Sequence, residues 1–271
     1  MFKKSIANFL TIINLLLGFS ALILIALSLL DSYNYIELSC IFIFIASIVD
    51  VFDGKLARKL GTSGDFGKEL DSLADIVSFC LAPSFLIFYY LYDIVLIKIF
   101  YLIIISSLPL ICGAIRLARF NICFEQSDKS YYLGLPTPAN AIFICSSILF
   151  ILQPSNIILV EIGMSSFNIF DLIKYGFFIA YTLISEYTVI VFFFISSILM
   201  ITNISYSKFP VIKFNSKKDN LFNIIGIIIF SVFIFIGILN KEYRIVMLFF
   251  ISYYIVSGII KAIIHKINGE I

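Results

Sequence analysis

The chain has 271 residues, of which 61% are hydrophobic and only 13% are charged. Its mean hydropathy of +1.08 excludes an ordinary soluble domain, whose surface needs many more charged residues. The net charge of +2 provides no strongly basic surface, so no nucleic-acid partner is expected. These values predict an integral membrane protein whose solvent is the lipid bilayer.

Apolar segments long enough to cross a bilayer occur along the whole chain. A spanning helix needs about 20 mostly apolar residues. We predict eight such helices, at residues 7–30, 36–58, 71–91, 97–120, 134–152, 181–203, 220–240 and 244–264. The predicted fold is therefore an all-α, multi-pass membrane helix bundle that forms a single domain over residues 1–271.

The basic residues predict how this bundle is oriented. With eight spans, most of the 19 Lys and Arg residues fall on the side of the N-terminus, and the exceptions are Lys98, Lys174, Lys241 and Arg244. Cytoplasmic loops carry such an excess, so both termini are predicted to face the cytoplasm. A ninth span within residues 153–185 would move the lysines of residues 208–218 to the outside and is rejected for that reason.

Four aspartates interrupt the apolar pattern within residues 50–75. Asp50 and Asp53 end the second predicted helix, and Asp71 and Asp75 lie in the third, after the Gly-rich turn GTSGDFG at residues 61–67. Spacings of three and four residues place each pair on one face of its helix. Because helices joined by a short turn are antiparallel neighbours, the two pairs can converge at the cytoplasmic boundary.

Such a group of carboxylates requires compensating positive charge. A carboxylate within a bilayer costs at least about 2.5 kcal/mol, and four neighbouring ones also repel each other. Mg²⁺ and Mn²⁺ prefer oxygen ligands, so the four aspartates suit one or two of these ions. A solvated loop in which Asp and Lys residues pair would explain one of these aspartates, but hardly four in this spacing.

Small residues and an arginine follow the first pair of aspartates. Gly54 and Ala57 lie one turn apart and allow another group to approach the helix closely, although small residues also suit plain helix packing. Arg58 lies one turn from Gly54, where its guanidinium can clamp a phosphate. Together with bound cations, this groove suits a pyrophosphate.

The segment resembles the signature of the CDP-alcohol phosphatidyltransferases, with the spacing Asp50-x2-Asp53-Gly54-x2-Ala57-Arg58-x8-Gly67-x3-Asp71-x3-Asp75. The resemblance implies a membrane enzyme that transfers a phosphatidyl group from a CDP-linked lipid to an alcohol and releases CMP. It implies that the four aspartates bind two Mg²⁺ or Mn²⁺ ions and that Asp75 also takes the proton of the acceptor hydroxyl. It assigns the CDP part of the substrate to Gly54, Ala57, Arg58 and Gly67.

Three further segments are similar to the serine-using branch of this family: NLLLGFSA from Asn14, RLARFN at residues 116–121 and GLPTPANA at residues 134–141. The resemblance covers a core of about residues 1–210, followed by two additional helices at about 220–264. It implies CDP-diacylglycerol and L-serine as substrates, the bacterial cytoplasmic membrane as location, and a homodimer.

Three residues of RLARFN are candidates for binding the serine carboxylate or a lipid phosphate: Arg116, Arg119 and Asn121. The two arginines share one helix face, and ordinary anchoring at the cytoplasmic boundary is the alternative interpretation. Within the family, glycerol 3-phosphate or inositol phosphate is the alternative acceptor. A divalent-cation transporter is a more remote alternative, which predicts carboxylates near the midplane of several spans.

Whether the base of the predicted reaction is a carboxylate or a histidine can be tested with His265, the only histidine of the chain. His265 lies near the C-terminus between Lys261 and Lys266, a pattern typical of side chains at the membrane interface. We therefore expect His265→Ala to retain most of the CMP-release activity in an assay of the purified protein. A loss of a hundredfold or more in a folded variant would contradict a carboxylate base.

Overall fold

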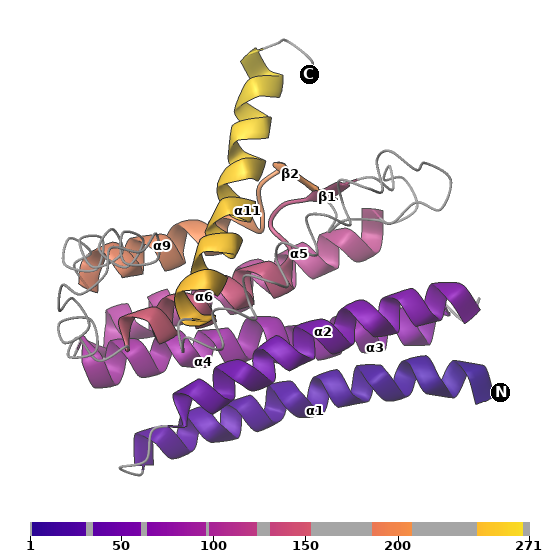
Figure 1. The fold of residues 1–271 in the computed structure, drawn as a ribbon, viewed down its shortest axis with the longest axis horizontal. Helices are drawn as coiled ribbons and strands as arrows, with labels where there is room; N and C mark the ends of the chain where they lie inside the picture. Colours follow the sequence, from indigo (N-terminus) through magenta and orange to yellow (C-terminus); the bar gives the residue numbers. More distant parts are fainter. Residues whose placement is uncertain are drawn as a thin grey trace, which may run out of the picture.

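The computed structural model describes residues 2–30, 35–60, 64–95, 98–123, 131–152, 186–207 and 243–267. Its elements are drawn in Figure 1 and have the bounds α1 (Phe2–Leu30), α2 (Ile36–Leu60), α3 (Asp65–Asp75), η1 (Ile76–Leu81), α4 (Ala82–Tyr89), η2 (Tyr90–Ile94), α5 (Ile99–Cys123), β1 (Tyr131–Leu133), α6 (Thr137–Ile151), α9 (Glu186–Leu199), β2 (Ser205–Ser207) and α11 (Tyr243–Ile267). The segments η1 and η2 are π-helical. This mostly helical composition confirms the all-α fold class.

Each predicted span that falls on described residues overlaps an observed helix. The span predicted at 220–240 and the segment 153–185 lie outside the described residues, so the total of eight stays a prediction. Within the described residues, four helices are long and apolar enough to cross a membrane: Asn8–Leu30, Asp65–Asp93, Ile99–Ile122 and Tyr243–Ile264. The helix α2 is equally long but carries Glu37 in its first turn and Asp50 and Asp53 in its second half, and α6 and α9 are shorter.

The third helix begins earlier than the sequence predicts. It starts at Asp65, with Gly64 as its N-cap, so residues 65–67 belong to the helix and not to the turn. A carboxylate in the first turn is favoured by the helix dipole, which helps the helix to begin there. A Cβ placed on Gly67 would lie 3.3 Å from Asn8 Oδ1, so the glycine also allows α3 to pack closely on α1.

Two prolines interrupt helical hydrogen bonding in the middle of the bundle. Pro83 is the second residue of α4 and lies just after the π-helical segment η1, whose wider turn accommodates a residue without an N–H. Pro109 lies inside α5, and the N–H of the next residue, Leu110, donates to Ser84 Oγ at 3.1 Å. This hydrogen bond joins α5 to α4.

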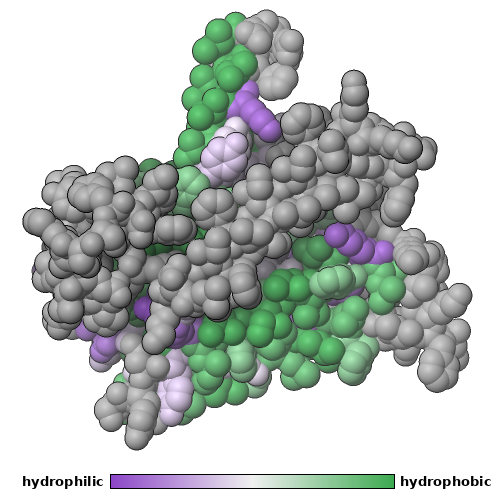
Figure 2. Space-filling model, in the orientation of Figure 1, coloured by the Kyte–Doolittle hydropathy of each residue, from purple (hydrophilic) through white to green (hydrophobic). Residues whose placement is uncertain are grey.

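The helices differ in how much surface they expose. The continuous helix from Asp65 to Asp93 is mostly buried, whereas α1 and α11 expose most of their length. Figure 2 shows that hydrophobic side chains cover the visible faces of these outer helices, and on α1 the exposed residues include Phe9, Leu16 and Phe19. An apolar outer surface of this kind requires lipid as its solvent, which confirms a membrane protein.

A short two-stranded sheet connects the chain between α5 and α6 to the chain after α9. The strands β1 and β2 are antiparallel, with Tyr132 opposite Tyr206. Next to them, the N–H of Gly134 donates to the carbonyl of Ile204 at 2.8 Å, and that of Leu135 donates to the carbonyl of Leu199 at 3.0 Å. These hydrogen bonds fix the segment GLPTPANA, whose Pro136 is the N-cap of α6.

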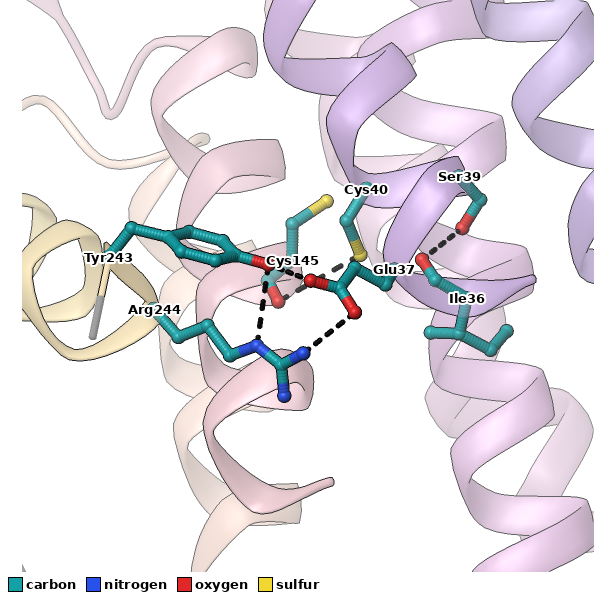
Figure 3. A network of polar contacts seen from close by, with 7 residues as sticks. All are labelled: Ile36, Glu37, Ser39, Cys40, Cys145, Tyr243 and Arg244. Carbon is teal, nitrogen blue, oxygen red and sulfur yellow. Dashed lines mark hydrogen bonds and ion pairs between the residues drawn. The ribbon is translucent and has the colours of Figure 1, made fainter. Parts of the chain in front are cut away.

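A polar network joins α2 to α11 at the start of both helices (Figure 3). Glu37 accepts a hydrogen bond from the hydroxyl of Tyr243 and forms an ion pair with Arg244, with 2.7 Å between Oε2 and Nη2. Nearby, the thiol of Cys40 contacts the carbonyl oxygen of Cys145 at 3.9 Å, which brings α2 against α6. The two helix starts therefore lie on the same side of the bundle, as the predicted topology requires.

The backbone at Gly134 allows a test of this arrangement. Gly134 has a φ of +75°, and a Cβ there would collide with the carbonyl oxygen of Met200. We expect Gly134→Ala to destabilise the protein, because a left-handed conformation alone costs about 1–2 kcal/mol for other residues. The measurement is the thermal unfolding midpoint in detergent. Gly54→Ala is the control, since a Cβ on Gly54 meets nothing within 4 Å, and equal midpoints for the two variants would contradict the role of Gly134.

Candidate active site

Two helices bring three carboxylates together at one place. Asp50 and Asp53 lie one turn apart on α2, and Asp71 lies on α3, which packs against α1. One carboxylate oxygen from each of these three residues lies within 4.8 Å of the other two. Three oxygen donors this close form a ligand set for a hard divalent cation. We refer to Asp50, Asp53 and Asp71 as the carboxylate cluster.

The helix α1 fixes the orientation of one member of this cluster. Asp53 is only 3% exposed, and its Oδ2 accepts a hydrogen bond from Thr11 Oγ1 at 3.1 Å. A hydroxyl donor stabilises the ionised carboxylate and holds it in one rotamer. Thr11 therefore supports the cluster from the neighbouring helix α1.

Asp75 lies next to the carboxylate cluster and, like Asp53, is buried in the bundle. It comes one turn after Asp71 on α3, is buried, and is within hydrogen-bonding reach of Asp50. One oxygen each of Asp71 and Asp75 is buried without a hydrogen-bond partner among the described residues. Buried carboxylate oxygens without a donor are costly, so a divalent ion fits this site on chemical grounds.

The glycines of the signature have different surroundings. Gly54 adjoins Asp53 and faces open space, so nothing in the described protein requires the absence of a side chain there. Gly67 faces Asn8 of α1 and serves helix packing at least in part. Ala57 and Arg58 lie in the last turns of α2, and their side chains are outside the described part of the structure.

Arg116 of α5 brings a positive charge to the same site. It is only 7% exposed and interacts electrostatically with Asp75 and Asp50. Its Nε has no hydrogen-bond partner within the described ranges. The guanidinium therefore compensates part of the negative charge and retains a donor for a bound group.

The other two residues predicted from RLARFN contact protein groups. The guanidinium of Arg119 donates to the carbonyl of Ile201 at 2.8 Å and to Asn203 Oδ1 at 3.1 Å, which holds the loop between α9 and β2. The side-chain amide of Asn121 donates to Ser72 Oγ at 3.0 Å. The backbone carbonyl of Asn121 accepts a hydrogen bond from Lys68 Nζ at 3.0 Å. In this structure Arg119 and Asn121 connect the elements that surround the site.

Other polar side chains near the site were not predicted from the sequence. Asn14, Thr137 and Asn140 are fully buried, and their side-chain polar atoms have no hydrogen-bond partner in the described part of the chain. The sequence did contain a signal, because these residues are polar within apolar helices and lie in segments that mark the branch. From the sequence these segments predict membership of a branch, but helical spacing alone does not predict a site at these residues.

Comparisons with known proteins agree with this geometry. The sequence model of the CDP-alcohol phosphatidyltransferase family matches residues 4–168. The CDP-diacylglycerol-serine O-phosphatidyltransferase of Helicobacter pylori strain 26695 is 31% identical over 232 residues, which cover 85% of this chain and 81% of the relative. Proteins of the same name match from Bacillus subtilis, at 42% identity over 39% of this chain and 57% of the relative, and from Methanocaldococcus jannaschii, at 38% over 52% and 58%.

The carboxylate cluster predicts direct metal binding. We expect the purified protein to bind Mn²⁺, and Asp50→Asn or Asp71→Asn to weaken this binding at least about tenfold, because each change removes an anionic oxygen ligand. Titration followed by electron paramagnetic resonance measures the affinity. Asp65→Asn is the control, since Asp65 lies on the same helix α3 but is exposed. Unchanged Mn²⁺ affinity in both cluster variants would contradict the site.

Proposed function

Because the chain belongs to the CDP-alcohol phosphatidyltransferase family, we propose that it transfers a phosphatidyl group from CDP-diacylglycerol to L-serine, forming phosphatidylserine and CMP. The choice of acceptor rests above all on Arg116, a buried guanidinium beside the carboxylate cluster. Serine differs from neutral alcohols by its carboxylate, which a guanidinium binds well. Membership of the family leaves the cation-transporter alternative without support.

The liponucleotide is proposed to bind along α2 and α3. The carboxylate cluster, with Asp75 beside it, would hold two Mg²⁺ or Mn²⁺ ions. When bound, such ions neutralise the pyrophosphate charge and make CMP a better leaving group. The open space at Gly54 supports its predicted place beside the CDP part, where Ala57, Arg58 and Gly67 are also predicted to contribute.

Asp75 is proposed as the base that activates the acceptor. Its buried position and its unpartnered oxygen support this role, because both favour proton uptake from a neighbouring hydroxyl. The serine oxygen would attack the phosphorus that carries diacylglycerol, and the bond from that phosphorus to the CMP oxygen would break. The proton passes to Asp75, and no covalent enzyme intermediate is needed.

Of the three residues predicted to bind the acceptor or a lipid phosphate, we assign direct contact to Arg116. A direct role for Arg119 or Asn121 would require them to exchange their present partners on the α9–β2 loop and on α3. We propose that these two residues instead position the elements around the site. The roles can be separated, because a binding residue affects one substrate and a positioning residue affects both.

We further propose the membrane location and the orientation of the enzyme. The excess of Lys and Arg on the side of the N-terminus supports a cytoplasmic active site and cytoplasmic termini. The relatives from Helicobacter pylori and Bacillus subtilis support a bacterial cytoplasmic membrane. The family resemblance also predicts a core of about residues 1–210 and two further helices within about 220–264. It predicts a homodimer as well.

The acceptor is tested by supplying purified protein with CDP-diacylglycerol, Mg²⁺ or Mn²⁺, and one alcohol at a time. We expect serine to support CMP release and phosphatidylserine formation, and excess chelator to stop both. Arg116→Lys should raise the KM for serine by about tenfold or more, because a lysine cannot make the paired hydrogen bonds of a guanidinium. The KM for CDP-diacylglycerol should change much less.

Arg119→Lys is the matched control for this experiment, since it lies one turn further on the same helix. We expect it to lower the thermal stability and not to raise the KM for serine selectively. CMP release with glycerol 3-phosphate or inositol phosphate, and none with serine, would refute the acceptor assignment and leave the metal site intact.

A further inference from the structure

Two polar residues at the start of α6 have no role in the reaction as described so far. Thr137 and Asn140 are fully buried, and neither the hydroxyl nor either amide atom has a hydrogen-bond partner among the described residues. They lie one turn apart on the same face of α6. A buried hydroxyl and amide without partners are costly in any protein, so the polar atoms on this face of α6 are available to a bound polar group.

This face of α6 meets α5 and η1 close to the active site. A Cβ on Gly113 of α5 would lie 3.6 Å from Thr137 Cγ2 and 3.2 Å from Cys80 Cβ, so the three elements are in contact there. Arg116 lies one turn after Gly113 on α5, and it interacts electrostatically with Cys80 and Asp75. Thr137 at the start of α6 therefore lies near the arginine and the proposed base, and Asn140 lies one turn further along the same face of α6.

The C-terminal helix α11 completes the surroundings of this place. Tyr254 of α11 and Tyr132 of β1 both interact electrostatically with Arg116. Tyr254 also packs against Tyr206 of β2, with 5.6 Å between the ring centroids, and Tyr206 contacts Gly258 of α11. Because α11 lies beyond the matched residues 4–168, this part of the surroundings is additional to the family core.

We propose that Thr137 and Asn140 determine specificity for the acceptor by binding the ammonium group of serine. The inference rests on the proposed function. An ammonium group has three N–H donors, and Thr137 Oγ1 and Asn140 Oδ1 are two acceptors without other partners. Arg116 binds the carboxylate on the adjoining helix, and the serine hydroxyl then faces Asp75. The zwitterion thus matches a cationic group, Arg116, on one side and two uncharged oxygen acceptors on the other.

The test compares serine with 3-hydroxypropanoate, which has the same hydroxyl and carboxylate but no ammonium group. We expect the wild type to prefer serine in kcat/KM by about tenfold to a hundredfold, the value of hydrogen bonds to a charged group. Thr137→Val and Asn140→Leu should each raise the KM for serine and reduce this preference. The KM for CDP-diacylglycerol should change less than about threefold.

Two kinds of variant control for effects on folding. Ser146→Ala removes a buried hydroxyl from the same helix, but this hydroxyl already donates to the carbonyl of Ile142, so the preference should be unchanged. Thr137→Ser and Asn140→Asp retain an acceptor oxygen and should retain the preference for serine. If Thr137→Val or Asn140→Leu does not fold, loss of the preference in these two conservative variants would overturn the proposal.

The outcomes separate this inference from the proposed function. If the wild type releases no CMP with serine, the proposed function fails. If the wild type uses serine but Thr137→Val and Asn140→Leu keep both the KM for serine and the preference over 3-hydroxypropanoate, only the role of Thr137 and Asn140 fails. Buried water molecules would then be what satisfies their polar groups.

Discussion

The burial of like charges within an apolar helix bundle is the constraint on which the rest of this structure depends. The carboxylate cluster places oxygens of three aspartates within 4.8 Å of one another, with Asp75 beside them. Such a group is stable only if hydrogen bonds, a buried guanidinium and bound cations offset the repulsion. Thr11 on α1 and Arg116 on α5 provide the first two, so four helices must meet at one place.

Close helix packing follows from this requirement. A membrane helix gains little from hydrophobic burial against its neighbours, so close van der Waals contact and interhelical hydrogen bonds hold the bundle. Gly18 contacts Ser78, and Gly113 contacts Cys80, at positions where a larger residue would separate the helices. Ser78 Oγ also donates to the carbonyl of Asn14 at 2.8 Å. The same contacts keep α1 and α5 close enough to support the aspartates.

The polar residues around the site are of two kinds: some face the site, and others form hydrogen bonds between the elements that surround it. Arg116 is buried beside the aspartates, whereas Arg119, one turn away, binds carbonyl groups of the α9–β2 loop. Asn121 ties α5 to Ser72 of α3. Hydrogen bonds to backbone and amide groups therefore connect the elements around the site. The residues that face the site retain donors and acceptors for substrates.

The sequence by itself determined the all-α fold class, the membrane solvent and the pairing of aspartates on helix faces, because apolar length and helical spacing are local properties. Only the tertiary structure decided which arginine faces the aspartates, that Thr11 supports Asp53 from 42 residues away, and that Thr137 and Asn140 are buried without partners. It also placed the start of α3 at Asp65, where packing on α1 extends the helix into a Gly-rich segment. These features depend on contacts between distant segments, and local spacing does not contain that information.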